Sequence, residues 1–150
     1  MADIFDIAQW FLSQDDMTHK KLQKLCYYAQ AWHCALYDGK PFIKENFEAW
    51  VHGPVCRELY ARYAGYGWLD IPRASNNDEV FTGDELDILN AVYGLYKKFD
   101  GDQLEALTHR EAPWKNQRVG LQPYQSSTNV ISIADMKDYY LLQYQNAQND

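Results

Sequence analysis

Apolar residues recur at helical spacing through most of this sequence, and this spacing restricts the chain to a mainly α-helical fold. After Thr18, one apolar stripe consists of Leu22, Leu25, Cys26, Ala29, His33 and Leu36. The stripe ends at Asp38-Gly39, where glycine can adopt the left-handed conformation that closes many helices. Residues 18–36 are therefore predicted to form an amphipathic helix.

Further helices are predicted on both sides of this segment. Asp3 is suited to cap a short first helix that carries Ile4, Ile7, Ala8 and Phe11. Thr82 and Glu85 have the spacing of a capping box, and two apolar rows follow them as far as Phe99. Because two rows must be buried, we expect this long helix at the centre of a bundle. Shorter helices are expected after Pro54, over 102–109 and after Ser132.

One segment departs from the helical period. Between Pro41 and Pro54 the pattern alternates, with Phe47, Ala49 and Val51 on one side and Glu48, Trp50 and His52 on the other. This alternation predicts a strand near residues 47–51, with 79–81 as a candidate second β segment and Gly53-Pro54 as a hinge into the next helix. The predicted fold is mainly α: a compact single-domain helical bundle over 1–150 with a small β element near residues 47–51.

Charge and composition disfavour several classes of function. Lys and Arg number 14 against 21 Asp and Glu, and the resulting net charge of −7 opposes binding to nucleic-acid phosphates. No apolar run reaches the length of a membrane span, and Asp3 and Asp6 stand where a signal peptide needs positive charge. Three cysteines without CxxC spacing fit a reducing compartment. We therefore expect a cytoplasmic protein that binds neither membranes nor nucleic acid.

The sequence contains no familiar catalytic, metal or cofactor motif. The four histidines form no HExxH pattern, and GxSxG, GxGxxG and GxxxxGK[ST] do not occur. We therefore expect no metal and no cofactor. His33 lies within an apolar stripe and is predicted to be buried and structural. A hydrolase or transferase that uses His33, His52 or Cys56 stays open as an alternative, because a helix N-terminus lowers the pKa of a nearby thiol.

Aromatic residues make up 15% of the chain, and tyrosine and tryptophan are enriched in protein interfaces. The helix over 18–36 is predicted to expose a face opposite its apolar stripe, with the side chains of Lys20, Lys24 and Tyr27 on it and those of Lys21 and Tyr28 on its flank. Trp50 and His52 project from the side of the predicted strand that is not buried. The candidate partner-binding residues are Lys21, Lys24, Tyr27, Tyr28, Trp50 and His52. Trp50 as a second-layer core residue is the alternative.

Three blocks of this sequence resemble a known family. They are Lys21 to His33, then Ala49-Trp50 through Gly53-Pro54-Val55, and finally Leu107-Thr108-His109 with Pro113-Trp114. In this order they resemble the Panacea or SocA-like antitoxin domain, also called phage-associated GepA-like protein. The resemblance extends from Ile4 to about Tyr140. It departs at Ala31, where many relatives have glycine, and at Cys34, where a larger aliphatic residue is common.

This resemblance implies a mostly helical antitoxin that neutralises a cognate protein toxin by direct binding. The toxins of such systems are often small alarmone synthetases, and the antitoxin itself is not an enzyme. Members also occur in phages without an evident toxin, so a phage-encoded protein that interacts with a host partner is an alternative function.

Overall fold

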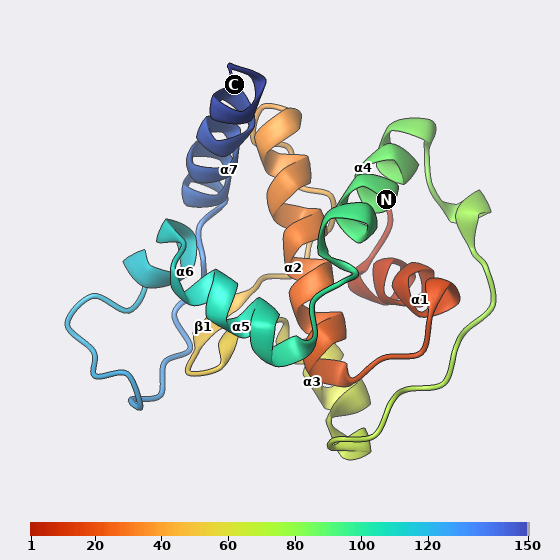
Figure 1. The fold of residues 1–150 in the computed structure, drawn as a ribbon, viewed down its shortest axis with the longest axis horizontal. Coiled ribbons are helices and arrows are strands. Elements are labelled where there is room, and N and C mark those ends of the chain that lie inside the picture. Colours follow the sequence, from red (N-terminus) through yellow and green to blue (C-terminus); the bar gives the residue numbers. More distant parts are fainter. Residues whose placement is uncertain (150) are drawn as a thin grey trace.

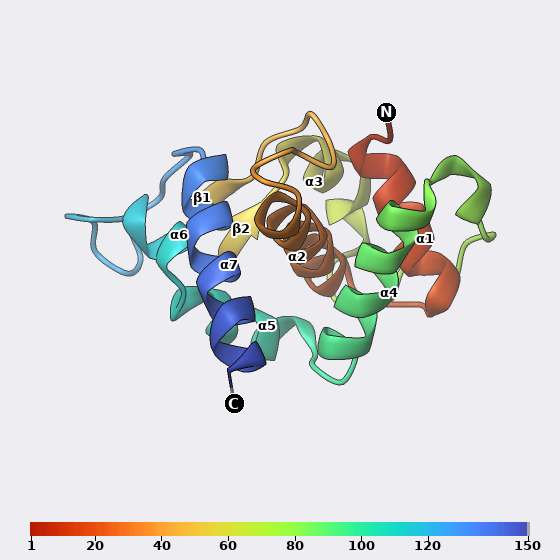
Figure 2. The same cartoon turned by 90° about the horizontal axis from the view of Figure 1, so that it is seen from above.

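Helix α2 (His19–Leu36) lies at the centre of the computed structural model, which describes residues 1–149. Figure 2 views α2 end-on, with the other elements on all sides of it. Thr18 caps the helix, since its side chain accepts a hydrogen bond from the amide of Lys21. Every residue from Leu22 to Ala31 is buried. The polar face of α2 is therefore enclosed as fully as its apolar face.

The predicted helices are present, and the mainly α fold is confirmed (Figure 1). Asp3 caps α1 as predicted, and the capping box predicted at Thr82 opens α4. Asp3 also forms a capping box, which was not predicted: in both boxes the cap side chain accepts a hydrogen bond from the amide of the third helical residue, whose carboxylate accepts one from the amide of the cap residue. The seven α-helices of residues 1–149 are α1 (Ile4–Gln14), α2, α3 (Arg57–Tyr63), α4 (Gly83–Tyr96), α5 (Gly101–His109), α6 (Ala112–Asn116) and α7 (Ile133–Gln148). Single 3-10 turns are η1 (Ala64–Tyr66) and η2 (Asp78–Val80).

A small antiparallel hairpin confirms the β element expected near 47–51. Strand β1 (Glu48–Trp50) pairs with β2 (Gly53–Val55), so that Trp50 lies opposite Gly53. The segment before α7 runs along the other edge of β1, where the amide of Ala49 donates to the carbonyl of Asn129 at 2.8 Å. Gly53-Pro54 was expected to lead directly into a helix, and that prediction is wrong. Proline is accommodated because β2 lies at the edge of the sheet.

Two other expectations about the arrangement are also wrong. Helix α4 is not central: Leu95, in its second apolar row, is 55% exposed. Helix α2 takes the centre because its polar side chains find partners in neighbouring segments. Residues 79–81 form no strand, because residues 78–80 form the 3-10 turn η2. Strand β1 pairs instead with β2, which follows it in the chain after a two-residue turn.

Two glutamines of α2 hold the segment that carries the hairpin. The Gln23 amide donates to the carbonyl of Cys56 at 3.0 Å and accepts from the amide of the same residue at 2.9 Å. Gln30 accepts from the amides of Phe42 at 2.8 Å and Ile43 at 3.1 Å and donates to the Ile43 carbonyl at 3.2 Å. Both ends of the segment 42–56 are therefore hydrogen-bonded to one helix. We call these contacts the glutamine clamp.

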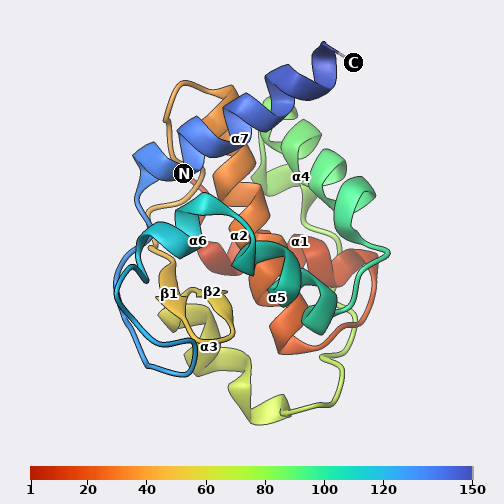
Figure 3. The same cartoon turned by 60° about the vertical axis from the view of Figure 1, so that its left-hand side comes forward.

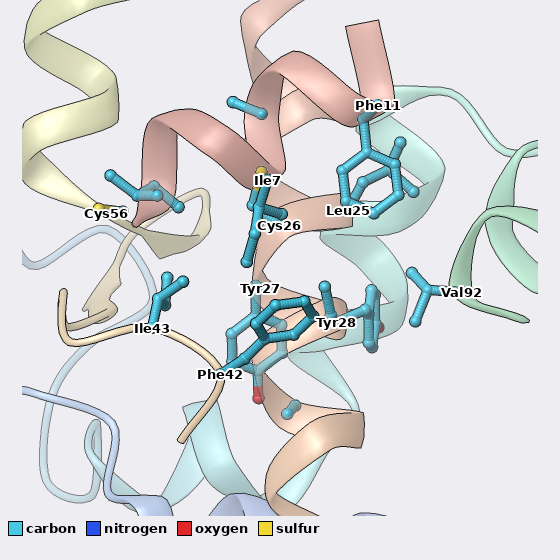
Figure 4. Close-up of a cluster of buried hydrophobic side chains, with 14 of the residues drawn as sticks. Ile7, Phe11, Leu25, Cys26, Tyr27, Tyr28, Phe42, Ile43, Cys56 and Val92 are labelled. Atoms are coloured by element: carbon cyan, nitrogen blue, oxygen red, sulfur yellow. The ribbon is translucent and has the colours of Figure 1, made fainter. Parts of the chain in front are cut away.

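The hydrophobic core forms where α1, α2, α4 and the segment 42–43 meet (Figure 4). Leu25, on the predicted apolar stripe of α2, and Leu89 and Val92, in the two predicted apolar rows of α4, are buried, as expected. The three cysteines are buried free thiols.

Truncation of a core leucine in α4 tests this packing. Leu89→Ala is expected to lower the free energy of unfolding by about 2 to 5 kcal/mol, because the removed methyl groups leave a cavity. Leu95→Ala, on the exposed side of the same helix, is the control and should cost less than about 1 kcal/mol. Urea denaturation of the two variants measures the difference. Equal midpoints would contradict the packing of α4.

Candidate functional site

The turn of the hairpin lies between two hollows in the protein surface. The larger, of about 430 Å³, is found at the N-terminal end of α2. Figure 3 shows the elements that contribute to it there: the hairpin, α3 and the start of α5. We call it the aromatic pocket; it is lined by Thr18, His19, Lys20, Gln23, Lys24, Trp50, His52, Tyr60, Gly67, Trp68, Asp100, Gly101 and Asp102. The smaller hollow, of about 290 Å³, is lined by Trp50, Val51, His52, Ser126 and Ser127. Trp50 and His52 contribute to both.

Aromatic side chains from three segments form the walls of the aromatic pocket. The rings of Trp50 and Tyr60 lie 5.0 Å apart between centroids, and the His19 ring meets Tyr60 edge-on at 5.9 Å. Trp68 follows Gly67, whose φ of +59° suits glycine, and its side chain is 88% exposed. A pair of backbone hydrogen bonds between Met17 and Ile71 holds this segment against the start of α2. The pocket therefore has a packed wall and one exposed indole.

A buried lysine forms the floor of the aromatic pocket. Lys24 is 1% exposed, and its ammonium donates to the Pro54 carbonyl at 3.2 Å. Burial and the nearby charge of Lys20 lower the pKa of Lys24 to about 7, while Glu105 acts in the opposite direction. A Cβ at Gly53 would stand 2.9 Å from Lys24 Cε, and the φ of Gly53 is +102°. Glycine is therefore required at the hairpin turn for two reasons, the backbone conformation and the lysine beneath it.

Charged residues at the edge of the pocket are paired with one another. Lys20 Nζ lies 2.7 Å from Asp102 and 2.6 Å from Glu105, and His52 Nδ1 lies 3.2 Å from Glu105. Burial alone would raise the pKa of Glu105, but the hydrogen bonds from Lys20 and His52 outweigh it and lower this pKa. Glu105 thus connects α5 to α2 and to the hairpin turn.

The structure brings together some of the predicted partner-binding residues. Lys24, Trp50 and His52 all line the aromatic pocket. Lys21 does not; its ammonium donates to the Lys97 carbonyl at 2.7 Å, beside the end of α4.

The prediction that α2 exposes Lys24, Tyr27 and Tyr28 is wrong. All three side chains are buried, because neighbouring segments cover this face of the helix. Tyr28 and Tyr140 both donate to the same carboxylate oxygen of Glu111, at 2.7 and 2.9 Å, and the Tyr27 hydroxyl lies 3.1 Å from that of Tyr140. Burial raises the pKa of Glu111, while the hydrogen bonds from the two tyrosines act against this. This tyrosine cluster connects α2, α6 and α7, so its hydroxyls serve the fold.

The residues of the alternative enzymatic function lie in three different environments. His33 is buried, as predicted, with Nδ1 2.7 Å from the Lys40 carbonyl. His52 faces Glu105 at the hairpin turn. Burial raises the pKa of the Cys56 thiol to about 12, which is the reverse of what a nucleophilic cysteine needs.

Residues 1–149 contain neither a metal-binding cluster nor a helix suited to span a membrane. No group of three or more His, Cys, Asp or Glu side chains in this range is placed to hold a metal ion. None of the helices in the same range is both long and apolar enough to cross a membrane.

Three aromatic residues of the pocket were not anticipated as site residues from the sequence: His19, Tyr60 and Trp68. Trp68 stands in a glycine-containing stretch without periodicity, so pattern analysis assigns it no face. The available signal was a large indole directly after Gly67, in a stretch where two glycines interrupt the helical spacing. An indole in such a stretch is not assigned to a core stripe, and an exposed indole indicates an interaction site.

Comparison with known proteins relates this chain to one family. The family model described as antitoxin SocA-like, Panacea domain, matches residues 22–115. This range contains Lys24, Trp50, Tyr60 and Trp68, and it excludes α1 and α7. No curated protein and no solved structure matches the chain significantly.

Proposed function

The chain belongs to the SocA-like antitoxin family with a Panacea domain, and from this premise we propose that it neutralises a cognate protein toxin by binding it directly. The family supports a role in binding rather than in catalysis, so we propose that the chain is not an enzyme. A small alarmone synthetase is the class of toxin that the resemblance favours. Binding of the toxin is proposed to take place in the cytoplasm, a reducing compartment in which three free thiols stay reduced.

We place the toxin-binding surface at the hairpin turn and the aromatic pocket. The observation that supports this most directly is the exposed indole of Trp68 beside a hollow of about 430 Å³. Leu69, Tyr60 and Tyr66 add further exposed apolar area on the same stretch of chain. Exposed apolar patches of this kind mark interaction sites, and tryptophan is the side chain most enriched among the residues that dominate binding energy.

Removing either indole is expected to weaken toxin binding selectively. Trp50→Ala and Trp68→Ala should each raise the Kd for the toxin by about 30-fold or more, since an aromatic anchor is commonly worth about 2 kcal/mol. The control is Leu142→Ala, which removes from α7 a 53% exposed side chain that does not line the pocket. Helix α7 runs beside the C-terminal half of α2, at the opposite end from α3 (Figure 1). Calorimetric titration of each purified variant with the toxin measures Kd, and thermal melts check folding.

The toxin for this experiment is identified genetically. We expect a neighbouring reading frame whose product is lethal when expressed alone and tolerated when expressed with this protein. If no neighbouring product behaves in this way, the antitoxin proposal fails. If the toxin binds both folded tryptophan variants as tightly as the wild type, the antitoxin function stands and the proposed surface is wrong.

A further inference from the structure

We propose that the aromatic pocket is also a small-molecule site, which binds a planar aromatic ring carrying a single oxygen acceptor, such as a carboxylate or an amide carbonyl. This inference goes beyond the antitoxin function, because the pocket would bind such a ligand without a toxin present. It rests on the shape of the pocket, the rings in its walls and the unfilled hydrogen-bonding capacity of its floor.

The walls favour a ring. A volume of about 430 Å³ lies within the range of small-molecule sites, which is about 300 to 1,000 Å³. Trp50, Tyr60 and Trp68 offer rings from three separate segments, and the indole of Trp68 is 88% exposed. A planar ligand would cover this indole and gain ring contacts with Trp50 and Tyr60, and aromatic pairs are favourable beyond the apolar area they bury.

The floor favours an oxygen acceptor. The ammonium of Lys24 has three hydrogens, and its hydrogen bond within the described chain is the one to the Pro54 carbonyl. His19 Nδ1 is buried, and among residues 1–149 it finds no hydrogen-bond partner. A buried polar group without a partner lowers stability, so a ligand oxygen that accepted a hydrogen bond from the Lys24 ammonium would be favoured there.

The neighbouring lysine shows why Lys24 is the group that would meet the ligand. Lys20 is already held by the carboxylates of Asp102 and Glu105, at 2.7 and 2.6 Å. Lys24 has no carboxylate within ion-pair distance in the part of the chain that the structure describes. The floor of the pocket therefore carries a cationic donor, Lys24, whose remaining hydrogens lack an acceptor in the described chain.

The rim restricts the ligand to one small acceptor. Asp100 and Asp102 line the mouth of the pocket, and both are exposed. Asp102 is paired with Lys20, whereas Asp100 has no ion-pair partner among residues 1–149. The Asp100 charge would repel a phosphate chain extending outward from the floor. A single carboxylate or carbonyl oxygen at the floor lies beyond the rim, so this charge opposes it less.

The test uses the full chain alone and three probes that share one ring: indole carboxylate, indole carboxamide and indole. Calorimetric titration or NMR shift titration should show saturable binding of the two oxygen-bearing probes, at least about tenfold tighter than indole. Lys24→Met should remove this advantage and retain the weak binding of indole, because the walls are unchanged. Trp68→Ala should weaken all three probes. Leu142→Ala, remote from the pocket, should behave as the wild type, and thermal melts verify the fold of each variant.

Three results would overturn the proposal. They are no saturable binding of either oxygen-bearing probe, equal affinity for all three probes, and an unchanged advantage in folded Lys24→Met. The outcome is separable from that of the antitoxin proposal, because the titrations contain no toxin. If toxin binding requires Trp68 but the pocket binds none of the probes, the antitoxin function is upheld and the small-molecule site is rejected.

Discussion

Lys24→Met is expected to raise the free energy of unfolding by about 3 kcal/mol at pH 7, although it removes a hydrogen bond. The pKa of Lys24 is held at about 7 in the folded chain against an ordinary value of 10.5. This difference corresponds to about 4 to 5 kcal/mol, since each pH unit is worth about 1.4 kcal/mol. Leaving the Pro54 carbonyl without its donor costs about 1 to 2 kcal/mol of this gain. Methionine has a similar shape and needs no partner at the floor.

The pH dependence of this gain has a definite sign. Below pH 7, Lys24 is protonated in both the folded and the unfolded chain, so the folded chain bears the full free-energy cost of the buried charge. Between pH 7 and 10.5 the unfolded chain binds the proton more readily than the folded one, so rising pH removes this cost and stabilises the wild type. The cost of the buried charge falls by about 2 kcal/mol between pH 7 and about pH 9, so the advantage of Lys24→Met should shrink from about 3 kcal/mol to less than about 1 kcal/mol.

Urea denaturation of both proteins at these two pH values measures the change. The buried cysteines and tyrosines also respond to alkaline pH, but the two proteins share them, so the difference between the proteins isolates Lys24. An advantage of equal size at both pH values would contradict the buried, protonatable lysine. So would a variant less stable than the wild type at pH 7.

Gly53→Ala is expected to lower the free energy of unfolding by about 2 to 4 kcal/mol. Alanine at a φ of +102° is strained, and its Cβ would lie 2.9 Å from Lys24 Cε and 3.0 Å from Thr108 Oγ1. Thr108 is buried and its hydroxyl donates to the Glu105 carbonyl, so it cannot easily move aside.

Two other glycines separate the causes of this loss. In the described chain, a Cβ at Gly67 or at Gly83 would meet nothing within 4 Å, but Gly67 has a φ of +59° and Gly83 opens α4 with no such value. Gly67→Ala should cost about 1 to 2 kcal/mol from strain alone, whereas Gly83→Ala should change stability by less than about 1 kcal/mol. Melting of all three variants gives the comparison. If Gly53→Ala were no worse than Gly67→Ala, the close packing above Lys24 would be refuted.

The helices of this protein could be predicted because their signals are local. Asp3, Thr18 and Thr82 cap the helices that the sequence predicts, and the apolar spacing that follows each cap needs no knowledge of the rest of the chain. The arrangement of the helices was harder to predict. Helix α4 has the more apolar sequence, yet α2 is central because Gln23 and Gln30 find backbone partners in a distant segment.

The candidate site could be predicted only where its sequence signal is local. Alternation along β1 correctly assigned Trp50 and His52 to the side away from the core. The tyrosines of α2 look solvent-facing by periodicity, but Tyr28 reaches a carboxylate 83 residues away in the chain. Helical spacing alone does not show whether a polar side chain faces water or a buried partner.

The glutamine clamp has a consequence for the thermodynamics of association. Because Gln23 and Gln30 fix both ends of the segment 42–56 to α2, the hairpin turn is ordered before any ligand arrives. Ordering a flexible loop on binding lowers affinity through lost conformational entropy. Here that loss has already occurred during folding, so contacts made at Trp50 and His52 can contribute to affinity almost undiminished.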